Sequence, residues 1–173
     1  PLPTYAVMLS RYPIRASGTV ALSDHQDQLP RRTRALVRML RPVGWSRIRD
    51  RNALTADIET PTGLARIINI HLTLSNPAWR LEEFEAAMMH RDRALPTIVC
   101  GDFNILEHPR VPLINWLAGG RISDVFLHRR ERTIIEKHFI KYELANPLAG
   151  TRTHPLSRSQ LDHILVSHSF TIK

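Results

Sequence analysis

The sequence predicts an α/β fold, because short β-branched segments alternate along the chain with segments of helical periodicity. At 173 residues the chain fits one domain with a sizeable core, and its hydrophobic content of 43% is ordinary for a globular protein. No apolar run approaches the roughly 18 residues needed to cross a membrane, and no signal peptide is visible. We therefore expect one globular domain over residues 1–173.

The predicted strands are short runs rich in β-branched and apolar residues, at positions 5–10, 17–22, 53–59, 64–72, 97–100 and 160–167. The turn Pro61-Thr62-Gly63 predicts a hairpin between the third and fourth of these strands. Apolar residues at helical spacing predict helices over 31–41, 77–93 and 111–117. Residues 122–127 are predicted as a short strand or loop, and 144–158 as a long loop.

The chain is strongly basic, with a formal net charge of +8 and 21 arginines against 3 lysines. Arginine is the better residue for bidentate phosphate contacts, and a basic domain attracts polyanions. The alternative is that these arginines form an ordinary solvated surface. Cys100 is the single cysteine, so an internal disulfide is excluded. It is expected to be a small buried hydrophobe. The lack of an internal disulfide gives a mild preference for the cytoplasm.

The central feature is the stretch 97–104, in which a buried strand leads into Gly-Asp-Phe-Asn. If the chain stays extended, Asp102 and Asn104 point the same way with Cα atoms roughly 7 Å apart, and Phe103 points into the core. A carboxylate and an amide at the end of a buried strand suit a hard metal ion and a phosphate oxygen. The alternative is an ordinary turn, since Gly, Asp and Asn are common turn residues.

Two further polar residues lie at predicted strand ends. His71 ends the strand 64–72, and Asp162 opens the last strand. Taken singly, His71 is more often a satisfied core group and Asp162 an edge charge. Taken together with Asp102 and Asn104, they place groups of the acid–base and metal repertoire at the ends of three strands, which defines a candidate site.

Three ordered motifs in this chain resemble those of the endonuclease/exonuclease/phosphatase superfamily. They are residues 68–72 (Ile-Asn-Ile-His-Leu), 101–104 (Gly-Asp-Phe-Asn) and 160–167 (Gln-Leu-Asp-His-Ile-Leu-Val-Ser), and the resemblance runs from about Tyr5 to Ser167. It implies an α/β four-layer sandwich of two mixed β-sheets flanked by helices. It also implies a hydrolase that cleaves phosphodiesters or phosphomonoesters with Mg²⁺ or Mn²⁺.

The resemblance also implies a role for each candidate site residue. Asp102 would orient or deprotonate the attacking water, and Asn104 would hold the scissile phosphate or an oxygen bound to the metal, so both are expected at the metal. His71 matches a position that contacts the phosphate or pairs with an upstream glutamate. Asp162 matches the aspartate that orients the catalytic histidine.

The chain departs from the family pattern at both ends. Members carry a metal-binding glutamate before the region matched here and a Ser-Asp-His motif after the last strand, and these 173 residues contain neither. His163 is not assigned the catalytic role, because the residues after it fit the earlier motif. We therefore expect a domain truncated at both ends, with weak metal binding, poor hydrolysis and an unpaired sheet edge open to dimerisation.

The sequence thus favours a metal-dependent nuclease that acts as a nucleic-acid phosphodiesterase. One alternative is a phosphatase or lipid phosphodiesterase of the same fold, which would act on a small phosphoester and not on DNA. Another is a DNA-binding module that kept the fold and lost the chemistry, which would bind with strong salt dependence and never cleave.

Overall fold

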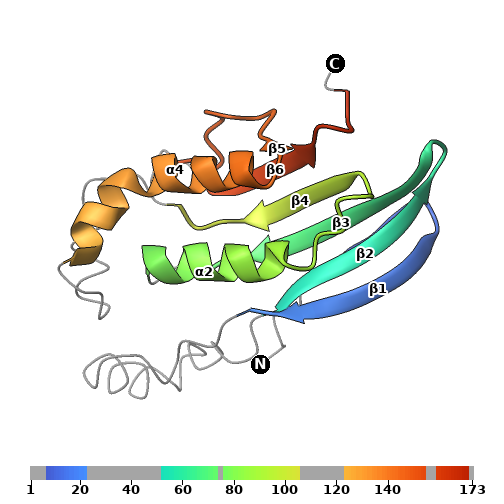
Figure 1. Ribbon diagram of the computed structural model, residues 1–173, viewed down its shortest axis with the longest axis horizontal. Helices are drawn as coiled ribbons and strands as arrows, with labels where there is room; N and C mark the ends of the chain where they lie inside the picture. The colour runs from blue at the N-terminus through green and yellow to red at the C-terminus, as the bar shows by residue number, and fades with distance from the viewer. Residues whose placement is uncertain (1–6, 23–51, 74–75, 106–122, 155–158, 172–173) are drawn as a thin grey trace.

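The computed structural model describes residues 7–22, 52–73, 76–105, 123–154 and 159–171, with the backbone alone for 123–129. In these residues a six-stranded mixed sheet runs in the order β1-β2-β3-β4-β6-β5 (Figure 1). The strands are β1 (Ile14–Ala21), β2 (Asn52–Thr60), β3 (Gly63–His71), β4 (Thr97–Asp102), β5 (Leu144–Ala145) and β6 (Asp162–Ser167). Two helices, α2 (Pro77–Met88) and α4 (Ser123–Lys141), accompany them.

The strand pairing follows from the connections between strands. β2 and β3 form the predicted hairpin, whose last registered pair is Thr60 with Gly63. β3 and β4 pair in parallel, and α2 makes the crossover that parallel strands require. The order of the sheet places β3, β4 and β6 side by side at its centre, which is where the candidate site residues lie.

Helix α2 begins at a well-formed cap. The Asn76 side chain accepts hydrogen bonds from the backbone N–H groups of Ala78 and Trp79, and Pro77 occupies the first turn, where its missing N–H costs nothing. The helix ends at Met88 rather than near residue 93 as predicted. The N–H of Arg91 bonds the carbonyl of Met88 at 3.1 Å, a tightened turn that closes the helix.

Helix α4 was not predicted. Residues 123–127, predicted as strand or loop, are its first turns, and the prediction is wrong there. Ile135 and Phe139, one helical turn apart, are buried, while most side chains between and around them are polar or exposed. Two buried apolar residues among many charged ones give only a weak helical periodicity in the sequence. The helix is stabilised mainly by its tertiary packing.

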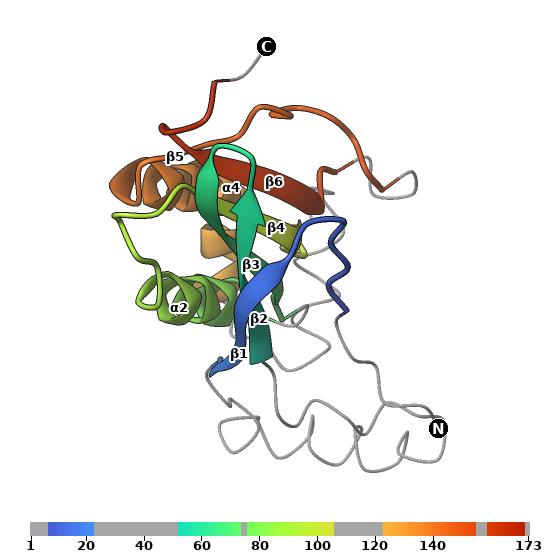
Figure 2. The ribbon, with the colours of Figure 1, turned by 90° about the vertical axis from the view of Figure 1, so that its right-hand side faces the viewer.

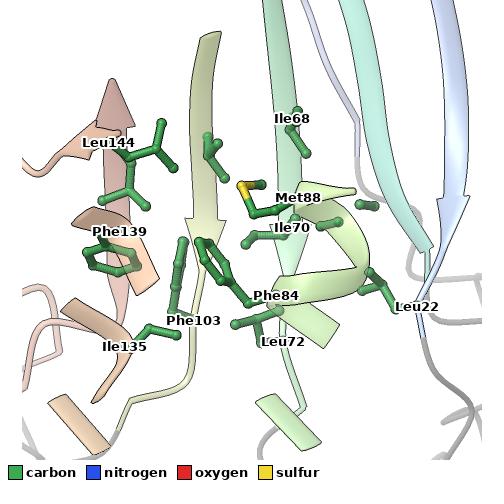
Figure 3. Packing of buried hydrophobic residues seen from close by; sticks show 14 of the residues in the cluster. Leu22, Ile68, Ile70, Leu72, Phe84, Met88, Phe103, Ile135, Phe139 and Leu144 are labelled. Carbon is green, nitrogen blue, oxygen red and sulfur yellow. The ribbon is translucent and has the colours of Figure 1, made fainter. Parts of the chain in front are cut away.

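The core lies between one face of the sheet and both helices (Figures 2 and 3). Phe84 of α2 and Phe139 of α4 meet Phe103, which follows β4, with ring centroids 5.6–5.8 Å apart. Ile70 of β3 and Leu165 of β6 complete this layer from the sheet side. The α/β class is therefore confirmed, with one mixed sheet and one helical layer of the predicted sandwich in the described residues.

The strand predicted over 17–22 is confirmed as β1, which begins earlier and runs from Ile14 to Ala21. Val7 to Ser10 are not in a strand, so the prediction over 5–10 is wrong for these residues. Most of β1 is exposed, because it is an edge strand held by backbone pairing to β2 rather than by burial.

Several predictions fall on other parts of the chain. The helices predicted over 31–41 and 111–117 lie outside the described residues. The predicted loop 144–158 contains the two-residue strand β5, and its described remainder is irregular. None of the described helices is both long and apolar enough to cross a membrane.

Candidate active site

Three of the predicted site residues lie in one row across the centre of the sheet. His71 is registered with Asp102 in the parallel pair β3–β4, and Asp102 is registered with Asp162 in the antiparallel pair β4–β6. Directly paired residues have Cα atoms about 4.5–5.5 Å apart, so the Asp162 backbone lies well within the same site as Asp102. We call His71, Asp102 and Asp162 the site row.

The site row lies on the face of the sheet opposite the helices. In the neighbouring registered row, Ile70 and His163 are both buried, with only 1% of their surface exposed, and the His163 ring contacts Phe139 of α4. Side chains alternate between the two faces of a strand, so the adjacent residues His71 and Asp162 point away from the core. Both are exposed, as expected for groups that must meet a substrate.

Asp102 is the most shielded member of the site row. Burial raises the pKa of its carboxyl above the ordinary value, and the nearby charge of Asp162 acts in the same direction. The N–H of Asn104, and also His71 and His154, act in the opposite direction and lower this pKa. Asp102 Oδ2 lies 3.9 Å from His71 Nε2, which allows an ionic attraction but is too long for a hydrogen bond.

Asn104 does not continue the strand as the sequence analysis expected. Its backbone is left-handed, with φ 53°, and its N–H donates to Asp102 Oδ1 at 2.8 Å. This is an Asx turn, in which an aspartate side chain closes a loop onto the backbone two residues later. Of the two alternatives that the sequence left open, the extended chain is therefore wrong at Asn104 and the turn is present, while Phe103 points into the core as predicted.

The Asn104 side chain is anchored to the neighbouring strand. It is buried, and Nδ2 donates to the carbonyl of Leu72 at 2.8 Å, just beyond the end of β3. A carboxamide nitrogen carries two hydrogens, so a second N–H remains beyond this bond. No hydrogen-bond donor of the described residues contacts Oδ1 of Asn104. The turn thus holds a carboxamide beside the Asp102 carboxylate.

Gly101 precedes this turn and brings β4 close to β3. Its φ is 131°, and a Cβ atom at this position would lie 1.9 Å from the carbonyl oxygen of Ile70. Only glycine fits so close to the neighbouring backbone. The glycine of the motif therefore permits the tight approach of β4 to β3 at the row next to the site.

Two histidines near the site differ in role. His163 is a core residue, since its ring centroid lies 4.7 Å from that of Phe103 and its Nε2 lies 3.2 Å from the Gln160 carbonyl. Sequence reasoning missed His154, which acts to lower the pKa of Asp102. Thr153 Oγ1 accepts hydrogen bonds from the N–H groups of Leu161 and Asp162, which fixes this loop against the start of β6. His154 is a single histidine in a predicted loop, so nothing in the sequence pattern marked it as a site residue.

The oxygen atoms of Asp102 and Asn104 are of the kind that a hard divalent cation prefers. In the described part of the chain, however, no three His, Cys, Asp or Glu side chains gather closely enough to hold a metal ion. The two predicted ligands therefore fit a Mg²⁺ or Mn²⁺ site as part of its shell, and the described residues supply no complete one.

A family model described as the endonuclease/exonuclease/phosphatase family matches residues 6–173. None of the curated proteins matches the chain. Among solved structures, an endonuclease/exonuclease/phosphatase from Beutenbergia cavernae has a TM-score of 0.55 at 17% identity, over 92% of this chain and 39% of that one. This likeness shows the fold.

Two other solved structures are less similar. The catalytic domain of human nocturnin has a TM-score of 0.49 at 17% identity, over 91% of this chain and 49% of that one. A mannosyl-6-phosphatase from Bacteroides thetaiotaomicron has a TM-score of 0.47 at 16% identity, over 91% and 54%. Both scores are too low to add to the argument. The chain spans about half or less of the length of these structures.

Proposed function

Because the chain belongs to the endonuclease/exonuclease/phosphatase family, a family of generally metal-dependent phosphoester hydrolases, we propose that this protein is a phosphodiesterase that cleaves nucleic acid with the help of Mg²⁺ or Mn²⁺. The observation that carries the proposal is the site row. It joins two carboxylates and a histidine on one exposed edge of three adjacent strands, next to the carboxamide of Asn104.

Asp102 is the proposed general base. Its raised pKa makes the carboxylate a better proton acceptor than an exposed aspartate, and a general base contributes about 10²- to 10⁴-fold to a rate. Its Oδ1 is occupied by the N–H of Asn104, so Oδ2 is the oxygen that would orient the water and accept its proton. The Asx turn thereby fixes the direction in which the carboxylate acts.

The other residues would bind and orient the substrate. The second N–H of Asn104 Nδ2 can donate to an oxygen of the scissile phosphate, and exposed His71 can contact the same group from the next strand. Asp162 would take the position from which, as the family motif implies, a carboxylate orients the catalytic histidine and fixes its tautomer. These roles follow the family motifs and agree with the side of the sheet on which each residue lies.

A divalent cation would be held in part by Asp102 and Asn104. When bound, it would neutralise the charge that develops on the phosphate in the transition state. Asn104 and His71 would then contact the phosphate of a substrate that the cation also helps to hold.

The nucleic-acid part of the proposal rests on charge. A net charge of +8, carried mostly by arginine, favours a polyanionic substrate through counterion release. A small phosphoester would gain little from such a surface.

The test measures hydrolysis of DNA, RNA and a small phosphomonoester by the purified protein, with Mg²⁺, with Mn²⁺ and with a chelator. We expect slow, metal-dependent cleavage of nucleic acid and a further drop of about 10²- to 10⁴-fold in Asp102→Asn, because the base is lost while the turn acceptor remains. Glu136→Gln, which removes an exposed carboxylate on α4, is the matched control and should keep full activity.

Three outcomes would contradict the proposal. Cleavage that persists in the chelator would exclude the metal, and unchanged turnover in Asp102→Asn would exclude the base. Hydrolysis of the phosphomonoester with none of either nucleic acid would favour the phosphatase alternative.

A further inference from the structure

A buried polar cluster lies directly beneath the end of β3. It consists of Arg80 and Glu83 of α2, Glu131 of α4 and the backbone of Thr73, and each of these residues is at most 5% exposed. We call these four residues the Thr73 cluster. Charged side chains are rarely buried without a defined partner or task, so the cluster needs an explanation.

The cluster holds both backbone groups of one residue. The N–H of Thr73 donates to Glu83 Oε2 at 2.6 Å, and Arg80 Nη1 donates to the Thr73 carbonyl at 3.1 Å. Arg80 also forms a two-pronged pair with Glu131, through Nε at 2.5 Å and Nη2 at 2.8 Å. Thr73 lies just beyond the end of β3, and these contacts hold its backbone there.

The residue before Thr73 contacts the site directly. The N–H of Leu72 donates to the carbonyl of Asp102 at 2.9 Å, and the Leu72 carbonyl accepts from Asn104 Nδ2 at 2.8 Å. The carbonyl of Leu72 belongs to the same peptide unit as the N–H of Thr73. The hydrogen bond from Thr73 to Glu83 therefore fixes the plane of the peptide that holds the Asn104 carboxamide.

We propose that Glu83 and Arg80 are positioning residues for the active site: Glu83 orients Asn104 through the Leu72–Thr73 peptide, and Arg80 holds the Thr73 carbonyl on the other side of the same residue. They touch neither substrate nor metal. The proposal rests on the proposed function for its catalytic consequence, whereas the orientation of Asn104 can be measured without any activity. Supporting groups of this kind typically contribute about 10- to 100-fold to activity or metal affinity.

Three variants separate positioning from general stability. Glu83→Met removes the acceptor for the Thr73 N–H at similar volume, whereas Glu83→Gln keeps an oxygen there. Arg80→Met combined with Glu131→Leu removes the donor to the Thr73 carbonyl together with its partner charge, a replacement that folded proteins often tolerate. Met88→Ala, in the same helix and core, is the control for simple destabilisation.

The measurements are kcat and KM for nucleic-acid hydrolysis well below each melting temperature, and the NMR signals of the Asn104 side-chain amide, assigned with Asn104→Ala. We expect Glu83→Met and the double variant to lower kcat about 10- to 100-fold and to shift the Asn104 amide signals. Glu83→Gln should restore most of both properties, and Met88→Ala should change neither.

The outcomes distinguish the two proposals. Unmoved Asn104 signals in both Glu83→Met and the double variant would overturn the positioning role, as would an equal loss of kcat in Met88→Ala. If the signals move as expected but wild-type protein hydrolyses no phosphoester, the positioning role stands and the proposed function fails. Should Glu83→Met not fold, the double variant decides the matter by the same two measurements.

Discussion

At the scale of single residues, Gly101 makes the most specific demand on the backbone. Its positive φ is unfavourable for other residues, and the Ile70 carbonyl occupies the space where a Cβ atom would lie. We expect Gly101→Ala to lower the free energy of unfolding by roughly 3 kcal/mol or more, combining strain with a backbone clash.

Chemical denaturation of Gly101→Ala beside Gly63→Ala would separate these two contributions. Gly63 has nearly the same φ, 127°, but a Cβ atom there would meet nothing within 4 Å. Its substitution should therefore cost only the backbone strain, about 1–3 kcal/mol. Equal losses in the two variants would mean that the close approach at Ile70 has no energetic weight.

The ionised carboxyl of Asp102 is expected to lower the free energy of unfolding while it serves as the proposed base. Its pKa is raised in the folded protein, so ionisation is less favourable there than in the unfolded chain. Stability is then fully retained below the unfolded pKa near 3.8 and is lost as the pH rises toward the folded pKa. At neutral pH the whole penalty is present.

We therefore expect Asp102→Asn to melt at a higher temperature than wild type at pH 7, with the difference vanishing near pH 3. The rise should be small, because 33% of the Asp102 side chain is exposed to water. Asparagine keeps an oxygen for the Asx turn, so the local backbone should persist. Thermal unfolding at both pH values provides the measurement, and a lower melting temperature at pH 7 would show that the carboxylate stabilises the fold.

At the scale of the helices, the pair Arg80–Glu131 joins α2 to α4 in the interior. Removing one partner of a buried ion pair is strongly destabilising, since the remaining charge is left without its partner. Arg80→Met alone should lower the free energy of unfolding by about 3–5 kcal/mol.

The added change Glu131→Leu should recover most of that loss, because two apolar residues of similar volume need no ionic partner. Urea denaturation of the single and double variants measures the recovery. A double variant as unstable as Arg80→Met would mean that the guanidinium contributes mainly through its bond to Thr73.

At the scale of the whole molecule, elements with a strong local signal were predictable and the others were not. The hairpin β2–β3 and the start of α2 follow from turn chemistry and a proline, and both are confirmed. Helix α4 depends on Ile135 and Phe139 meeting an aromatic cluster assembled from distant parts of the chain. That contact is tertiary, so the segment alone does not carry it.

In the candidate site too, some features could be predicted from the sequence and others could not. Asp102, His71 and Asp162 could be placed near one another because each ends or begins a strand, and strand ends share an edge of a sheet. The sequence offered both an extended chain and a turn at Asn104 and could not decide between them, because the turn depends on a hydrogen bond to the Asp102 side chain that competes with extended pairing. The Thr73 cluster was equally hidden, since its charges read as an ordinary helix surface in the sequence.

The site row also ties the chemistry to the correct alignment of three strands. A slip of β4 by a single residue would leave the sheet hydrogen-bonded, yet it would turn Asp102 into the apolar interior and bring Phe103 out to water. A compact but misaligned chain would therefore be catalytically silent, however normal its secondary structure. Turnover thus reports on something that circular dichroism does not detect, namely which residue of each strand faces its neighbour.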